Sequence, residues 1–467
     1  MPRRYKETAS VLRYLNPSTN ALIAGVSLSV FAALILLAAH ILALFSTTDT
    51  LGANFMSVPA IVLQIGGYVL AVAGLSLTAT GLISLVTMSE ARKITHQTRK
   101  ALYLPAKGNP LKLKDGELLP KVKTKKIDEG KFELSVSTSS VTVEEIGKAA
   151  SAISSGLSRR FRNYAVVKRV DSIARNDVTF TLADVTVDRA IKVSSIEQLK
   201  PLSPTKLIVQ KGTYIDLTAS GSILLCGATR SGKSMTATSL LGQVLQVPRS
   251  KYSEVLLIDP KRAEISQLPH TVTLDDDGEA RAILKAMQKF AETVTKRQEV
   301  INECTRRTGK TTKYYNAGLS PNFIFIDEYI SLRSLLPKRA SKDDPNYSVE
   351  VFDSLLKRIA HMGNSAGCFV MLSIAQASTE QGLPTALRSA MTTRILLRPT
   401  PEDGRLLGWN SEMVETLPKL DYSAGQAWFS SSDGIHHHPS LVHFPVYSDN
   451  FKDMEELSRL LIEYYRQ

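Results

Sequence analysis

Residues 222–234 read SILLCGATRSGKS and decide the fold. The run up to Cys226 is apolar, which is typical of a buried β-strand, and a helical pattern through Leu241 and Leu245 follows the loop. Between strand and helix lies the pattern GxxxxGK[ST], in which glycines let backbone amides and a helix N-terminus surround a phosphate chain. This order predicts a nucleotide-binding phosphate loop in an α/β domain.

The phosphate loop also predicts roles for individual side chains. We expect Lys233 to reach the β- and γ-phosphates and to serve catalysis there, and we expect the Ser234 hydroxyl to ligate Mg²⁺. The residues that we expect to bind the nucleotide are Gly227, Ala228, Thr229, Arg230, Ser231, Gly232, Lys233, Ser234 and Met235.

A second apolar run ends in two acids, because residues 323–328 read FIFIDE. Adjacent acids at the end of a strand can aim one carboxylate at the metal and the other beyond it, so Asp327 suits Mg²⁺ and Glu328 suits the attacking water. The alternative is that both acids cap the next helix. GTPases normally lack the second acid and carry other base-reading motifs. We therefore expect a P-loop ATP hydrolase that uses ATP and Mg²⁺, with Glu328 as the catalytic base.

The N-terminal part of the chain predicts a membrane hairpin. Residues 14–91 contain no Lys or Arg, and two apolar runs, about 21–45 and 60–86, are each long enough to cross a bilayer core of about 30 Å. Lys and Arg cluster before the first run and after the second, so both termini and the ATPase domain should be cytoplasmic, in a multi-pass protein of the plasma membrane. A cleaved signal peptide is the rival interpretation, but the first run is too long for one and a second run follows it.

Small residues recur every seven positions in the second apolar run, at Ala60, Gly67, Gly74 and Gly81. This spacing predicts a seam on one helix face that permits close helix packing. Chance enrichment of glycine is the alternative.

Composition bounds the rest of the chain. Lys and Arg number 57 against 44 Asp and Glu, a formal charge of +13, which favours polyanionic partners. Three scattered cysteines exclude a disulfide framework, and the consecutive histidines 436–438 would point to alternate faces of a strand rather than to one metal ion.

We divide the chain into a basic N-terminus (1–19), a transmembrane hairpin (20–89), a basic juxtamembrane linker that contacts lipid (90–130), a small α/β domain (131–203) and the ATPase domain (204–467).

Several ordered motifs resemble those of FtsK/SpoIIIE-type DNA translocases. The similarity covers about Pro204 to Phe444 and includes the family's IDPK strand, in residues 256–264 (LLIDPKRAE). The further matching elements are KRIAHMG (357–363), AGCFVMLSIAQ (366–376), TRI (393–395), EDGR (402–405) and AGQA (424–427).

The resemblance implies a RecA-like motor domain and roles for further residues. Gln376 matches the family's polar sensor of the γ-phosphate, with a buried amide as the alternative. Arg394 and Arg405 are candidate arginine fingers, because a ring motor needs a cation from the neighbouring subunit, although either could form a surface ion pair instead. The sequence departs from the family at Arg230, where Gly is common, and at Asn364, where Arg is common.

The two transmembrane runs and the stretch FIDEY (325–329) are most similar to the TcpA-type conjugative coupling proteins of Gram-positive plasmids and integrative conjugative elements. This implies a homo-hexameric, membrane-anchored translocase that delivers DNA, with a relaxase or relaxosome, to transfer-channel proteins. One short helical run follows Phe451, with no module for reading bases, so we expect contacts with the DNA backbone only. The alternative is an FtsK-like ATPase of a type VII-like protein secretion system, although those usually carry three tandem ATPase modules.

Overall fold

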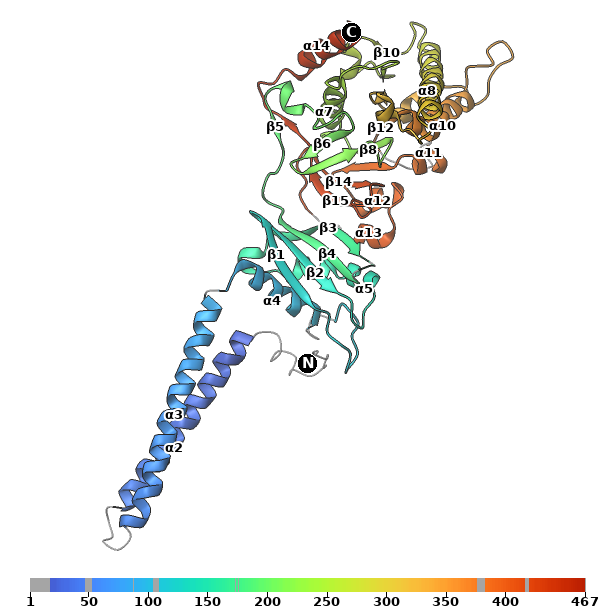
Figure 1. Ribbon diagram of the computed structural model, residues 1–467. Helices are drawn as coiled ribbons and strands as arrows, with labels where there is room; N and C mark the ends of the chain where they lie inside the picture. Colours follow the sequence, from blue (N-terminus) through green and yellow to red (C-terminus); the bar gives the residue numbers. More distant parts are fainter. Residues whose placement is uncertain are drawn as a thin grey trace. The chain divides into compact units, whose positions relative to one another are not determined.

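The structure is a computed structural model (Figure 1). It describes residues 17–46, 53–86, 88–103, 109–172, 174, 176–375, 383–415 and 420–466. The chain divides into two compact units, one of residues 1–166 with 171–184 and the other of residues 167–170 with 185–467.

Two long apolar helices stand at the start of the first unit, α2 (Pro17–Ser46) and α3 (Ala53–Val86). Within them, the stretches Asn20–Leu44 and Pro59–Ile83 are long and apolar enough to cross a membrane. Most side chains along both stretches are not buried in the chain, which is what lipid-facing helices require. The two apolar spans are therefore present as helices close to the predicted bounds.

The two helices pack through small residues. Ala60, Gly67, Gly74 and Gly81 are all buried in α3, and Gly25, Ala32 and Ala39 are buried at the same seven-residue spacing in α2. The predicted seam is therefore confirmed, and it has a counterpart on the other helix that the sequence analysis did not identify.

The small domain of the first unit is a four-stranded sheet in the order β1-β2-β4-β3, in which β1 and β4 both run antiparallel to β2. Alternate residues of β2, namely Phe132, Leu134 and Val136, are apolar and buried. They form the core of the small domain together with residues of α4, which precedes the sheet in the sequence, and of α5 and α6, which follow β2. The elements are α4 (Glu90–Tyr103), β1 (Val122–Asp128), β2 (Lys131–Ser137), α5 (Val143–Lys148), α6 (Ala150–Gly156), β3 (Tyr164–Ser172) and β4 (Asp177–Asp184).

The predicted linker at residues 90–130 is wrong, because this segment supplies helix α4 and strand β1 to the small domain. Its many lysines and arginines suggested a solvated linker, yet several of them, such as Arg92 and Lys100 of α4 and Lys123 of β1, lie on the exposed faces of regular elements. Ile94 and Leu102 of α4 are completely buried, and Val122 of β1 is buried between exposed neighbours. The end of the domain differs too, since residues 185–203 belong to the second unit, where Ile196 and Leu199 are buried.

An eight-stranded sheet forms the centre of the second unit, in the order β10-β9-β11-β12-β8-β13-β14-β15. The strands from β10 to β13 are parallel, and β14 and β15 extend the sheet in antiparallel fashion. Their bounds are β8 (Ile223–Gly227), β9 (Val255–Ile258), β10 (Thr271–Val272), β11 (Asn322–Ile326), β12 (Cys368–Ile374), β13 (Thr393–Leu397), β14 (Gln426–Ser431) and β15 (Ser440–His443).

Helices cover both faces of this sheet (Figure 1). Ile223 and Leu225 of β8 pack in the same cluster as α7 (Lys233–Leu245) and α14 (Asp453–Arg466), whereas Leu224 and Cys226 pack with α8 (Arg281–Thr308) and α10 (Val349–Ala366). A strand buried on both sides has no polar alternation, as its sequence predicted. The α/β fold with a phosphate-loop domain is therefore confirmed. The shorter elements are β5 (Lys192–Val193), β6 (Lys206–Gln210), β7 (Thr213–Asp216), α9 (Tyr329–Leu335), α11 (Thr385–Ala390), α12 (Pro401–Leu406), α13 (Ser411–Glu415) and β16 (Val446–Tyr447).

Candidate functional site

The candidate site lies at the carboxyl ends of the parallel strands. Gly227 ends β8, and Asp327 and Glu328 follow β11 directly. The strands are in register at this edge, because Ile326 of β11 pairs with Leu372 of β12, and Ile374 at the end of β12 pairs with Cys226 of β8. Ligands of open α/β sheets bind at this edge, where loops from several strands converge.

The phosphate loop takes a conformation that explains its glycine and one unusual residue. Gly232 has φ +91° and stands at the N-terminus of α7, where the amide of Thr236 donates to its carbonyl oxygen at 2.9 Å. Arg230 has φ +64°, a left-handed conformation that is uncommon for a residue with a Cβ atom. This conformation gives a physical reason why glycine suits that position in similar sequences.

A segment that is distant in the sequence is hydrogen-bonded to the loop. The amide of Gly425, which lies just before β14, donates a hydrogen bond to the carbonyl oxygen of Ser231 at 3.1 Å. His443 of β15 holds the same stretch, because its Nε2 lies 3.2 Å from the carbonyl oxygen of Ala424. The antiparallel end of the sheet therefore fixes the position of the phosphate loop.

Glu328 contacts two lysines at once. Its Oε1 lies 2.9 Å from Nζ of Lys233, and its Oε2 lies 3.2 Å from Nζ of Lys261. Burial alone would raise the pKa of Glu328, but the two ammonium groups outweigh it and the pKa is lowered. The carboxylate is therefore ionised, and it lies within reach of the lysine that we expect to bind the terminal phosphates.

Asp327 has the opposite electrostatic character. Its partial burial at the end of β11 raises its pKa, and the nearby carboxylates of Glu328 and Asp259 add to this effect, while Lys233 opposes it. A buried carboxylate with acidic neighbours is stabilised by a cation. The exposed Ser234 hydroxyl supplies a further oxygen at the start of α7, so the two predicted metal ligands fit a hard cation such as Mg²⁺.

A cavity of about 750 Å³ opens over the phosphate loop. Such a volume is within the range of nucleotide-sized ligands. Within the loop, Gly227 and Ser231 are buried, and the other seven predicted nucleotide-binding residues line the cavity. The lining residues are Ala228, Thr229, Arg230, Gly232, Lys233, Ser234, Met235, Thr238, Glu264, Glu328, Asp453 and Met454.

Four of these lining residues were missed by the sequence analysis, and one of them, Thr238, lies on α7 itself. Glu264 follows β9, and Asp453 and Met454 begin the last helix, α14. Helix α14 packs against α7, and its first turn thereby reaches the cavity from more than 200 residues away in the sequence. No local motif signals such an approach.

The remaining predicted catalytic residues have different positions. Gln376 lies outside the described residues. Arg394 is half-buried in β13, where its guanidinium donates to the carbonyl oxygens of Met391 at 3.3 Å and of Gly408 at 3.4 Å, and burial lowers its pKa. Arg405 of α12 is exposed, and its side chain contacts no partner within the described part of the chain. Of the two arginines, Arg405 is therefore the one whose guanidinium is not held by its own subunit.

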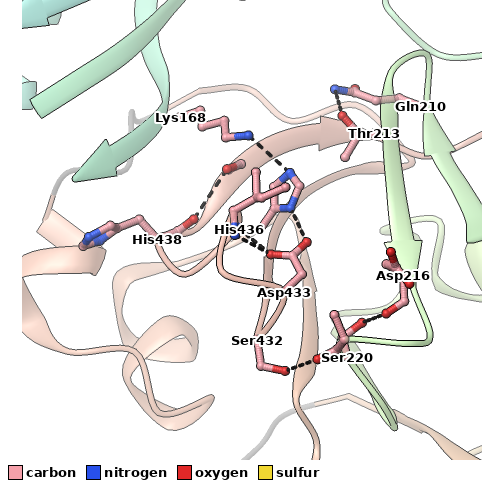
Figure 2. Close-up of polar contacts among 12 residues, drawn as sticks. Lys168, Gln210, Thr213, Asp216, Ser220, Ser432, Asp433, His436 and His438 are labelled. Carbon is pink, nitrogen blue, oxygen red and sulfur yellow. Dashed lines mark hydrogen bonds and ion pairs between the residues drawn. The ribbon is translucent and has the colours of Figure 1, made fainter. Parts of the chain in front are cut away.

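The two buried histidines near the C-terminus, His436 and His443, have different polar partners and do not share one centre. Nδ1 of the buried His436 lies 2.7 Å from a carboxylate oxygen of Asp433. Figure 2 shows the two side chains facing each other. His443 instead lies 3.1 Å from a carboxylate oxygen of Asp188. Among the described residues, no three His, Cys, Asp or Glu side chains gather as a metal site.

Comparison with known proteins shows what this domain is similar to. Residues 194–418 match the FtsK/SpoIIIE family model. The Ftsk domain-containing protein YdcQ of Bacillus subtilis is 24% identical over 176 residues, which cover 38% of this chain and 34% of that protein. DNA translocase FtsK of Oceanobacillus iheyensis is 26% identical over 171 residues, 34% of this chain and 20% of that protein. The chain thus spans about a third or less of the length of these relatives.

Solved structures also resemble the chain. The pCW3 conjugation coupling protein TcpA, solved as a monomer with ATPgS, has a TM-score of 0.48 and 15% identity, covering 79% of this chain and 99% of that one. EssC (ATPases 2 and 3) from Geobacillus thermodenitrificans has a TM-score of 0.41 and 17% identity, covering 60% of this chain and 52% of that one.

Proposed function

We propose that the protein is a membrane-anchored, ATP-driven DNA translocase that acts as a coupling protein in conjugation. The match of residues 194–418 to the FtsK/SpoIIIE family model supports this proposal. In this proposal it delivers DNA, together with a relaxase complex, to a transfer channel. We further propose that the two apolar helices anchor it in the plasma membrane. The clustering of Lys and Arg outside the two helices supports a cytoplasmic position for both termini and the motor domain.

The observation that carries the proposal is that the phosphate loop and Glu328 line one cavity, and that Asp327 stands next to Glu328 at the end of β11. In this proposal Lys233 and Ser234 would bind a triphosphate and its Mg²⁺, with Asp327 as the second metal ligand. When bound, Mg²⁺ would neutralise charge on the phosphate oxygens. Glu328 would accept a proton from the attacking water, and an arginine of a neighbouring subunit would stabilise the transition state in a hexameric ring.

The formal charge of +13 supports DNA as the cargo. Contacts between lysines or arginines and phosphates release counterions, so DNA binding of this kind weakens steeply as salt rises. We propose that the motor holds the DNA backbone without reading bases, and that a partner protein selects the DNA to be transferred.

The test is ATP hydrolysis by the full-length protein in lipid nanodiscs, alone and with single- or double-stranded DNA. Lys233→Ala provides the blank, because it removes the phosphate-binding ammonium. Stimulation by one form of DNA that is lost at high salt would support a DNA motor and identify its substrate. Robust hydrolysis that neither form of DNA changes would contradict DNA as the cargo and favour the alternative, a type VII-like ATPase that moves polypeptides.

A further inference from the structure

Lys261 stands on a rigid turn beside the proposed catalytic centre. Asp259, at the end of β9, is completely buried, and its carboxylate accepts hydrogen bonds from three backbone amides of the turn. The donors are the amides of Lys261 at 3.0 Å, Ala263 at 2.8 Å and Ser266 at 3.0 Å. A carboxylate that satisfies three amides fixes the backbone of the turn, and with it the point from which the Lys261 side chain extends.

The next residue strengthens the same turn. Arg262 has φ +53°, and its guanidinium donates to the carbonyl oxygens of Leu274 at 2.9 Å and of Asp275 at 3.1 Å. Arg262 is thus bound to the loop that follows β10, whereas Lys261 points to the end of β11. The two adjacent basic residues have different roles, which their sequence alone does not distinguish.

Lys261 contacts the oxygen of Glu328 that Lys233 does not. Lys233 contacts Oε1 and Lys261 contacts Oε2, so each oxygen of the carboxylate has its own ammonium partner. The Lys261 side chain is 49% exposed, against 21% for Glu328, so the charge of Lys261 remains solvated while that of Glu328 is largely shielded. An ion pair that fixes both oxygens restricts rotation of the carboxylate as well as stabilising its charge.

We infer that Lys261 is a positioning residue for the hydrolysis proposed above, and that its ammonium orients the Glu328 carboxylate. The inference rests on the proposed function of Glu328 as the base. Lys233 is expected to bind the β- and γ-phosphates, a demand that competes with its contact to Glu328. Lys261 does not line the cavity, so we do not expect it to bind the phosphates as well. It can therefore hold the base throughout the reaction.

The test compares Lys261→Gln and Lys261→Arg with the wild-type full-length protein. We expect Lys261→Gln to lower kcat roughly tenfold at pH 7, within the range that general-base catalysis contributes, with little change in KM for ATP. We expect Lys261→Arg to restore most of the rate, because a guanidinium also bonds carboxylate oxygens. Lys289→Gln, on the exposed face of α8, removes the same charge away from the site and should leave kcat unchanged.

The split between kcat and KM, together with the rescue by Lys261→Arg, provides a readout that a purely structural role would not move. Lys261→Gln that binds ATP normally and keeps the wild-type kcat would overturn the inference while leaving the proposed ATPase function in place. A wild-type protein that hydrolyses no more ATP than Lys233→Ala would count against both.

Discussion

Gly232 and Gly425 approach so closely that a Cβ atom on Gly232 would lie 2.6 Å from the backbone nitrogen of Gly425. The neighbouring atom belongs to the backbone of a segment that the Ser231 carbonyl holds, so it cannot move aside as a side chain would. Gly232 also has φ +91°, which disfavours any residue with a Cβ. The phosphate loop therefore depends on glycine for two separate reasons.

Gly232→Ala should abolish ATP binding. The substitution forces the loop away from Gly425, which displaces the amides that would surround the phosphates. We expect the affinity for a fluorescent ATP analogue to fall by at least about 100-fold, equivalent to roughly 2.7 kcal/mol. Gly278→Ala is the matched control, because Gly278 has φ +81° and a Cβ added there would meet nothing within 4 Å, so it should retain normal affinity. Equal loss in both variants would show that backbone strain alone is responsible.

Glu328→Gln should separate binding from hydrolysis. The amide keeps the shape of the side chain but cannot accept a proton from water, so we expect kcat to fall by about 100-fold or more while ATP still binds. Single-turnover hydrolysis and equilibrium binding measure the two steps. Glu264→Gln is the control, because Glu264 lines the same cavity but is not proposed to accept a proton during hydrolysis. Undiminished hydrolysis in Glu328→Gln would contradict the assignment of Glu328 as the catalytic base.

The sequence predicted the local parts of this site better than the distant ones. The phosphate loop and the Asp327-Glu328 pair each follow a short apolar strand, so their placement follows from neighbouring residues and the rules of parallel sheets. Asp453 reaches the cavity only through the packing of α14, which no spacing in the sequence reveals. Residues 90–130 were misinterpreted because lysines on the exposed face of a strand have the same composition as lysines in a linker.

Arg405 and Arg394 can be distinguished by mixing inactive variants. If Arg405 acts in a neighbouring site, Arg405→Ala and Lys233→Ala should each lose hydrolysis, yet a mixture should recover part of it. Recovery follows because a site with intact Lys233 can then face a subunit with intact Arg405. The measurement is the ATPase rate across mixing ratios at constant total protein.

Arg394 provides the contrast in the same experiment. Its guanidinium donates to backbone carbonyls of its own subunit, so we expect Arg394→Ala to lower the unfolding temperature, with no recovery of activity on mixing. Recovery with Arg394→Ala and none with Arg405→Ala would reverse the assignment.

The helix hairpin should tolerate a larger residue on one face and not on the other. A Cβ on Gly74 would lie 2.8 Å from the backbone nitrogen of Ser29, whereas a Cβ on Gly66 would have nothing within 4 Å. Gly74→Leu should therefore destabilise the hairpin by about 1–3 kcal/mol through overpacking, and Gly66→Leu should not. Thermal unfolding in detergent compares the two variants, and equal unfolding temperatures would contradict the packing of α2 against α3.

His436 should make the protein less stable at mildly acidic pH. Burial lowers its pKa below the ordinary 6.5, although the bond to Asp433 opposes this effect. Below about pH 6.5 the unfolded chain then binds a proton that the folded chain does not, so the free energy of unfolding falls by up to about 1.4 kcal/mol per pH unit. We expect a weaker dependence of the unfolding temperature on pH between 7.5 and 5.5 in His436→Gln. The exposed His437, replaced by Gln, should leave this dependence unchanged.

The backbone of Glu328 has φ +48° and ψ +51°, in the left-handed region, at the N-terminus of α9. A non-glycine residue in that region costs of order 1 kcal/mol or more. A screen for heat resistance alone would therefore favour glycine or asparagine at this position, and it would select against the carboxylate assigned to the chemistry. Engineers who stabilise this protein should exclude position 328 from their libraries, because gains there would be made at the expense of turnover.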